Sequence, residues 1–185
     1  EDLRLAELRK VAAYKAERVE TYFTGIKNDL EVTRYFFNIK KNLPALAAFA
    51  GSPGDPRYLA AKNELDGQLR PKQAINGLAD ILLLEPGGKL VYSSSRGRSH
   101  KGFLKRLTEP GEKAFTEGKK RAYLSDVFRD ETEGGRPAML AAAPVLDNGM
   151  KFLGVVVFEL DLAPLYGLTG DMTGMGATGE VLLGE

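Results

Sequence analysis

Apolar side chains recur at three- and four-residue steps through the first 43 residues, with charged side chains between them. The recurring apolar positions are Leu5, Leu8, Ala12, Val19, Tyr22, Phe23, Ile26, Leu30 and Phe37. This period predicts one long amphipathic helix that is capped by Asp2 and ends near Asn42 and Pro44. At about 1.5 Å per residue such a helix extends roughly 60 Å, which exceeds what a compact domain of this size needs. The alternative is two shorter helices with a break near Thr33.

A second amphipathic helix is predicted from about Pro56 to Leu69. One or two apolar helical turns, 44–50, come before it, followed by a loop rich in Gly and Pro, 51–56. Asp55 is the expected N-cap of the second helix, and Pro56 takes its first helical position.

After Ala79 the apolar residues change from a helical period to the pattern of strands. Two hairpins are predicted: 79–84 with 89–94 across Glu85-Pro86-Gly87-Gly88, and 138–146 with 151–160 across Asp147-Asn148-Gly149. A further strand is predicted over 122–128 and a short helix over 110–119. Because most of these strands are joined by short turns, the sequence predicts an α+β fold with a five-stranded antiparallel sheet rather than a parallel one.

The end of the chain reads as a connector. A helical turn begins at Asp161, a glycine-rich stretch follows over 170–180, and the apolar run 181–183 resembles the start of a new strand. We therefore expect three parts: a helical lead-in over 1–78, a sheet module over 79–168, and over 169–185 a connector with the first strand of a truncated second module.

The composition excludes several functional classes. The 185 residues include one histidine, no cysteine and no tryptophan, with 26 Lys+Arg against 25 Asp+Glu. Without cysteine there is no thiol nucleophile, cysteine-ligated metal or disulfide, and we expect neither a metal nor a cofactor. The formal net charge of +1 gives no basic field for nucleic acid. The sequence has no signal peptide or long apolar span and begins with Glu1, so we expect a piece of a longer protein.

In their order and spacing these segments resemble the extracytoplasmic Cache (PAS-like) sensor domains of bacterial transmembrane receptors, specifically the membrane-distal module of the double-Cache type. The resemblance covers nearly the whole chain. It rests on the long helix with Tyr14-Lys15 and 19–23, the strand pair 81–84 and 88–93, and the segments 124–128, 141–145, 154–162 and 169–182. The last of these looks like the family's connector into its second module.

The resemblance implies the input domain of a receptor outside the cytoplasm. In this family the long helix rises from a first transmembrane segment, the distal module binds a small molecule over its sheet, and a proximal module leads to a second transmembrane segment. The output is commonly a histidine kinase or a methyl-accepting chemotaxis module. We therefore expect a periplasmic domain, attached to the membrane through helices outside this sequence, that binds a small-molecule ligand and forms a homodimer in the full-length receptor.

Pockets of this family lie between the sheet and the segment that covers it. The residues expected to bind the ligand are Tyr92, Ser94, Arg106, Tyr123, Asp126 and Asp130. An acidic side chain can pair with a ligand ammonium, while a tyrosine supplies an aromatic face and a hydroxyl. Two alternatives stay open, namely that Asp126 makes a structural hydrogen bond and that Tyr92 is part of the core.

The covering segment bears on the class of ligand. Members of the family that bind amino acids carry an Arg and a Trp-Tyr pair there and an Asp after the third strand. Asp130 matches that Asp, but residues 100–108 contain no Trp or Tyr. The segment is instead basic, with Arg96, Arg98, Lys101, Lys105 and Arg106. Guanidinium groups suit carboxylates, so a carboxylate ligand is one hypothesis, and a solvated basic loop is the other.

Catalytic chemistry has little support in this sequence, and we expect no catalytic residues. His100 has no nearby acid, and Ser93-Ser94-Ser95 lacks an activating base. Glu159 and Asp161 share one face of a strand, but Asp161 suits the N-cap of the following helix better. A competing hypothesis is a non-sensing module that dimerises through the heptad-like apolar positions of the first helix, although Lys15 and Asp29 interrupt that pattern.

Overall fold

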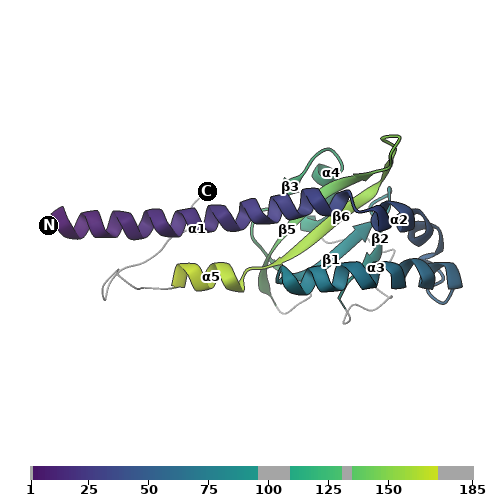
Figure 1. The fold of residues 1–185 in the computed structure, drawn as a ribbon, viewed down its shortest axis with the longest axis horizontal. Coiled ribbons are helices and arrows are strands. Elements are labelled where there is room, and N and C mark those ends of the chain that lie inside the picture. The colour runs from purple at the N-terminus through teal and green to yellow at the C-terminus, as the bar shows by residue number, and fades with distance from the viewer. Residues whose placement is uncertain (1, 96–108, 131–134, 171–185) are drawn as a thin grey trace. The chain divides into compact units, whose positions relative to one another are not determined.

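The computed structural model describes residues 2–95, 109–130 and 135–170, which belong to two compact units (Figure 1). The larger unit is Lys27–Asp161. The described residues of the other unit are 2–26 and 162–170. Among the described residues, no helix has an apolar stretch long enough to cross a membrane.

Two helices occupy the region where the sequence predicts one. They are α1, Asp2–Arg34, and α2, Phe37–Phe49. The prediction of one continuous helix is therefore wrong, and the alternative with a break near Thr33 is close to the observed break. Thr33 is buried, and its Oγ1 donates to the carbonyl of Asp29 at 2.6 Å, a contact that tends to bend a helix. Phe36 then adopts φ −57° and ψ 126°, which ends the helical path before α2 begins.

Two prolines lie inside helices, although the sequence predicts one helix to end near Pro44 and the next to end at about Leu69. Pro44 is within α2, and Pro71 is within α3, Pro56–Ile75, which is longer than predicted. The predicted cap of α3 is confirmed, because the Asp55 carboxylate accepts from the Arg57 backbone N at 2.8 Å. The hydrogen bonds from the Arg57 side chain and backbone lower the pKa of Asp55 to about 2.

The sheet has six strands, and every pair is antiparallel. The strands are β1 Leu78–Leu84, β2 Leu90–Ser93, β3 Tyr123–Leu124, β4 Phe128–Asp130, β5 Arg136–Leu146 and β6 Phe152–Asp161. Their order is β2-β1-β6-β5-β3, and β4 also pairs with β5. The remaining helices are α4 Glu109–Gly118 and α5 Ala163–Gly170.

The α+β class and both hairpins are as predicted, but the third predicted strand is split into β3 and β4. This split makes six strands instead of five. The interruption falls at Ser125, whose Oγ accepts from the backbone N of Leu140 at 2.9 Å. A side chain thus takes one position of the ladder, and the chain leaves the sheet before it pairs again at Phe128.

The predicted Asn-Gly turn joins β5 to β6, although its left-handed residue is Met150 with φ 63°. Gly149 itself is not among the residues with positive φ. The Asp147 side chain fixes the turn, because its Oδ1 accepts from the backbone N of Gly149 at 2.8 Å and of Lys151 at 2.9 Å. The turn therefore depends on Asp147 as much as on the Asn-Gly pair.

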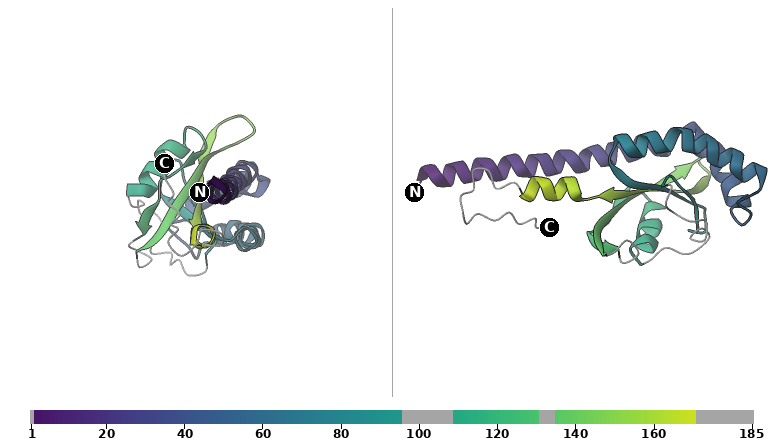
Figure 2. Two further views of the ribbon diagram at one scale, coloured as in Figure 1. Left: turned by 90° about the vertical axis from the view of Figure 1, so that its left-hand side faces the viewer. Right: turned by 90° about the horizontal axis from the view of Figure 1, so that it is seen from below.

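Helices cover both faces of the sheet, with α2 and α3 on one face and α4 on the other (Figure 2). Tyr92 points to α3, since its hydroxyl is 3.0 Å from Asp66, and Gly118 of α4 lies against Ala142. Successive side chains of a strand point to opposite faces, so the strand register shows on which face of the sheet each remaining residue lies. The α3 face carries Ile81, Leu83, Tyr92, Ser94, Val156 and Phe158, and the α4 face carries Asp80, Leu82, Ser93, Val155, Val157 and Glu159.

Candidate ligand-binding site

Tyr92, the first of the six predicted ligand-binding residues, lies in the interface between the sheet and α3. Its hydroxyl donates to Asp66 Oδ1 at 3.0 Å, and its side chain is fully buried. Burial raises the pKa of the Tyr92 phenol, and the negative charge of Asp66 adds to this shift. Asp66 also pairs with Lys62 at 2.5 Å and Arg70 at 2.9 Å. These contacts give Tyr92 a role in attaching α3 to the sheet.

Ser94 follows β2 and also faces α3. Its Oγ lies 2.7 Å from Gln73 Oε1 and 3.0 Å from Asp80 Oδ1, and it accepts from the backbone N of Ile81 at 2.9 Å. A hydroxyl has one proton to donate, so Gln73 and Asp80 share that single donor. Ser94 thus connects α3 with the start of β1.

Tyr123 and Asp126 come together around Lys113 of α4. Lys113 Nζ is 3.7 Å from Asp126 Oδ2, and the Asp126 side chain is 79% exposed. The electrostatic interaction with Tyr123, followed by that with Asp126, raises the pKa of the Lys113 ammonium. These two predicted residues therefore share one neighbourhood, at the surface beside α4.

Asp130 lies far along the sheet from that neighbourhood. Tyr123 pairs with Ala142 and Asp130 pairs with Arg136, six residues apart on β5. At about 3.4 Å per residue this separation is roughly 20 Å, too long for one small molecule to contact both side chains. Arg106 falls outside the described residues. The structure thus does not gather the described members of the predicted set into one pocket.

Two buried carboxylates on the α4 face were not among the predicted binding residues. Asp80 and Glu159 are register partners on β1 and β6, and they are 1% and 6% exposed. Each interrupts a strand whose other residues are mostly apolar, as in 81–84 and 153–158. Acidic residues are seldom fully buried without a structural or functional reason, so this interruption is the sequence signal that could have identified them.

Asp80 is held rigidly near the start of β1, an inner strand of the sheet. Its Oδ1 accepts from the backbone N of Ile81 at 2.8 Å and of Ser95 at 3.0 Å, in addition to the contact with Ser94. Its Oδ2 accepts from Ser93 Oγ at 2.5 Å. A carboxylate fixed in this way beside Glu159 makes one end of the α4 face negative, which favours a cationic group.

Comparison with solved structures gives the fold of most of the chain. The sensor domain of the Vibrio cholerae histidine kinase DctB matches with a TM-score of 0.65 and 16% identity, over 89% of this chain and 58% of that one. The ligand-binding domain of the Campylobacter jejuni chemoreceptor Tlp3, in complex with 4-methylisoleucine, matches with a TM-score of 0.59 and 12% identity, over 92% and 65%. The ligand-binding domain of the Pseudomonas aeruginosa chemoreceptor PctC, in complex with GABA, matches with a TM-score of 0.57 and 16% identity. This match covers 92% of this chain and 66% of the PctC domain.

No protein-family model matches the sequence, and neither does any curated protein. The chain spans between 58% and 66% of the length of these three solved domains. The α+β architecture, the long first helix and the antiparallel sheet agree with the resemblance found in the sequence. The chain thus has the fold of the Cache-type sensor domains of bacterial histidine kinases and chemoreceptors.

Proposed function

We propose that this chain is the extracytoplasmic input domain of a bacterial transmembrane receptor. It binds a small polar molecule over the α4 face and signals through α1 to a cytoplasmic histidine kinase or chemotaxis output. The observation that carries the proposal is the buried pair of Asp80 and Glu159 on that face. Domains of the same fold in Tlp3 and PctC hold 4-methylisoleucine and GABA, each of which has an ammonium group.

We assign Glu159 to contact a ligand ammonium, since it lies buried on β6 with Asp80 as its register partner. Asp80 accepts two backbone N–H groups and the Ser93 hydroxyl, which hold that partner in place. An ion pair in a site from which water is excluded is far stronger than one at the surface. The basic residues of 96–106, which the sequence predicts in the covering segment, lie outside the described residues.

The last turns of α1 are attached to the end of α3 and to β5 of the sheet. Asp29 of α1 accepts from Asn76 Nδ2 at 2.7 Å and pairs with Lys72 Nζ at 3.3 Å, near the end of α3. Arg34 Nη1 reaches the carbonyl of Pro144 on β5 at 3.5 Å. A ligand that changes the packing of the sheet therefore acts on α1 through these contacts, to the extent that it binds one arrangement better than the other.

A thermal-shift screen of amines, organic acids and amino acids tests the sensing proposal. A ligand at 100 times its Kd stabilises the folded chain by about 2.7 kcal/mol, which raises Tm by roughly 5–10 °C in a domain of this size. Glu159→Gln should weaken the binding of ammonium-bearing hits by about tenfold or more, because it removes the charge that pairs with them.

Glu64→Gln is the matched control, because Glu64 pairs with Lys41 on the helical side of the larger unit. This variant should bind every hit with wild-type affinity. The proposal fails if no compound shifts the Tm of the wild-type chain. It also fails if Glu159→Gln and Glu64→Gln bind the hits equally well.

Dimerisation through α1 is a second candidate function. Leu5 and Leu8, three residues apart on one side of the helix, are 51% and 39% exposed. Burial of such a stripe against the same stripe of a second copy would remove apolar surface from water. Sedimentation equilibrium should show a dimer for the wild-type chain and a monomer for Leu5→Glu/Leu8→Glu. A wild-type chain that stays monomeric at high concentration would contradict this function for the isolated domain.

A further inference from the structure

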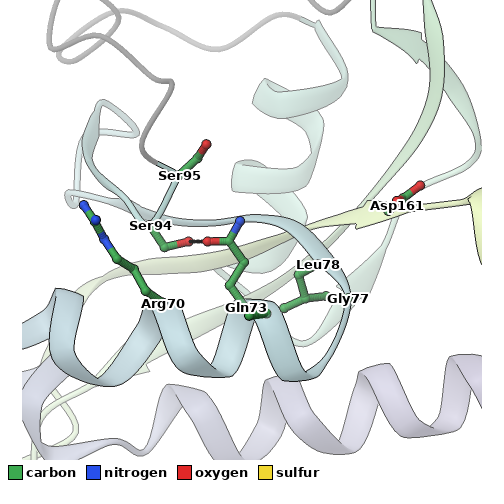
Figure 3. A pocket seen from close by; sticks show the side chains of 8 residues that line it. Arg70, Gln73, Gly77, Leu78, Ser94, Ser95 and Asp161 are labelled. Atoms are coloured by element: carbon green, nitrogen blue, oxygen red, sulfur yellow. Dashed lines mark hydrogen bonds between the residues drawn. The ribbon is translucent and has the colours of Figure 1, made fainter.

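A cavity of about 450 Å³ opens where α3 ends and β1 begins (Figure 3). Its size falls within the range of small-molecule sites, about 300–1,000 Å³. The polar side chains that line it are Arg70 and Gln73 of α3, Ser94 and Ser95 after β2, and Asp161 at the end of β6. Neither Glu159 nor the Tyr123–Lys113–Asp126 group lines it, so it is distinct from the site proposed above.

Arg70 gives this cavity a cation whose hydrogen-bonding capacity is not used up. Its Nη2 pairs with Asp66 at 2.9 Å, and its side chain is 29% exposed. Its Nε is buried and has no hydrogen-bond partner within the described part of the chain. An unsatisfied buried donor costs free energy. An acceptor brought to the edge of the guanidinium would remove that cost.

Gln73 and Ser95 add further donors beside Arg70. Gln73 Oε1 faces the Ser94 hydroxyl, and Gln73 Nε2 donates to the carbonyl of Ala79 at 2.8 Å, so the orientation of the amide is fixed. An amide nitrogen carries two protons, and this contact uses one of them. The Ser95 side chain lies above the Gln73–Ser94 pair (Figure 3). Donors therefore predominate around Arg70, while Asp161 supplies an acceptor elsewhere in the wall.

We propose that this cavity binds a small organic monocarboxylate. Arg70 and Gln73 hold the carboxylate, and Asp161 receives a hydroxyl or other donor at the far end of the molecule. A dianion is disfavoured, because Asp66 already shares the charge of Arg70 and Asp161 adds a second negative group. Such a ligand would connect α3 to the end of β6. The assignment does not depend on ligand binding over the α4 face.

Titration with acetate, 4-hydroxybutyrate and succinate, followed by amide chemical shifts, tests the assignment. We expect saturable shifts at Gln73, Ser94 and Ser95, with 4-hydroxybutyrate bound more tightly than acetate, and acetate more tightly than succinate. Arg70→Lys keeps the charge beside Asp66 but loses the planar fork, so it should weaken 4-hydroxybutyrate by about tenfold.

Lys62→Arg is the matched control, because Lys62 also pairs with Asp66 but does not line the cavity. This variant and Glu159→Gln should bind 4-hydroxybutyrate like the wild type. If Arg70→Lys does not fold, Gln73→Met provides the same readout. Absence of saturable shifts in the wild type, or equal affinity in the cavity variant and Lys62→Arg, would overturn the assignment. Saturable shifts at Leu82, Val155 and Val157 on the α4 face, without shifts at Gln73 and Ser95, would instead place the carboxylate over that face.

Discussion

Gly154→Ala is expected to lower the free energy of unfolding by about 4 kcal/mol, because it combines a steric overlap with backbone strain. Gly154 lies in β6, between β1 and β5, with φ 148°. A Cβ at this position would overlap the carbonyl oxygen of Leu84 on β1 and press on Leu43 of α2. The Leu84 carbonyl belongs to β1, which is paired on both sides and cannot shift freely. The substitution is therefore expected to weaken the hydrogen bonds between β1 and β6.

Chemical denaturation of the wild type and the variant measures this loss, which corresponds to a fall in Tm of roughly 10 °C. Gly67→Ala is the matched control, since Gly67 lies inside α3 and a Cβ there would meet nothing within 4 Å. That substitution should stabilise the chain by about 0.5–1 kcal/mol, because alanine favours a helix over glycine. Equal effects of the two substitutions would contradict the close approach of Gly154 to Leu84.

The elements that local sequence rules govern were predicted well. Both hairpins follow from their turn residues and alternating strands, and the start of α3 follows from Asp55 and Pro56. Each of these signals acts within a few residues and needs no knowledge of the rest of the fold. The α+β class then follows from the number of short connections.

The helix boundaries that were predicted wrongly depend on tertiary packing. Pro44 and Pro71 continue their helices, although proline normally ends one. Buried residues on both sides of Pro44 keep α2 packed against the sheet, while the last turn of α3 is held by the contacts of Lys72 with Asp29 and of Gln73 with Ala79. The break at Phe36 has no glycine or proline near it. It follows from the burial of Thr33 and the start of a separate packing surface at Ile39, which a linear pattern does not reveal.

The candidate site could be identified only once the register of the sheet was known. Tyr92 and Tyr123 are both tyrosines in predicted strands. The structure separates them, because Tyr92 contacts Asp66 on α3 whereas Tyr123 lies beside Lys113 on α4. A shift of one residue moves every side chain of a strand to the opposite face, and the sequence alone does not fix that shift. For the same reason the pairing of Asp80 with Glu159 could only be read from the structure.

Asp80→Ala is expected to cost about 3 kcal/mol of stability, because hydrogen bonds to a buried carboxylate contribute about 1.5–3 kcal/mol each and some of the donors can find other partners. The backbone N of Ile81 also reaches Ser94 Oγ, and that of Ser95 also reaches Ser93 Oγ at 3.2 Å. Among the described residues, Asp80 is the acceptor of the Ser93 hydroxyl, and no second acceptor takes its place. Asp80→Asn keeps one acceptor and should cost about half as much.

Hydrogen exchange measures the size of the stability loss in Asp80→Ala and shows which residues it affects. The amides of Ile81 and Ser95 donate to Asp80, so both should exchange faster in Asp80→Ala, while the β5–β6 hairpin keeps its protection. Asp147→Ala is the matched control, because Asp147 also accepts two backbone N–H groups but in an exposed turn. Its cost should be about 1 kcal/mol, the usual net value of neutral-donor contacts at a surface. If Asp80→Ala cost no more than Asp147→Ala, Asp80 would not be the residue that fixes the end of β2, and the rigid carboxylate beside Glu159 would lose its structural basis.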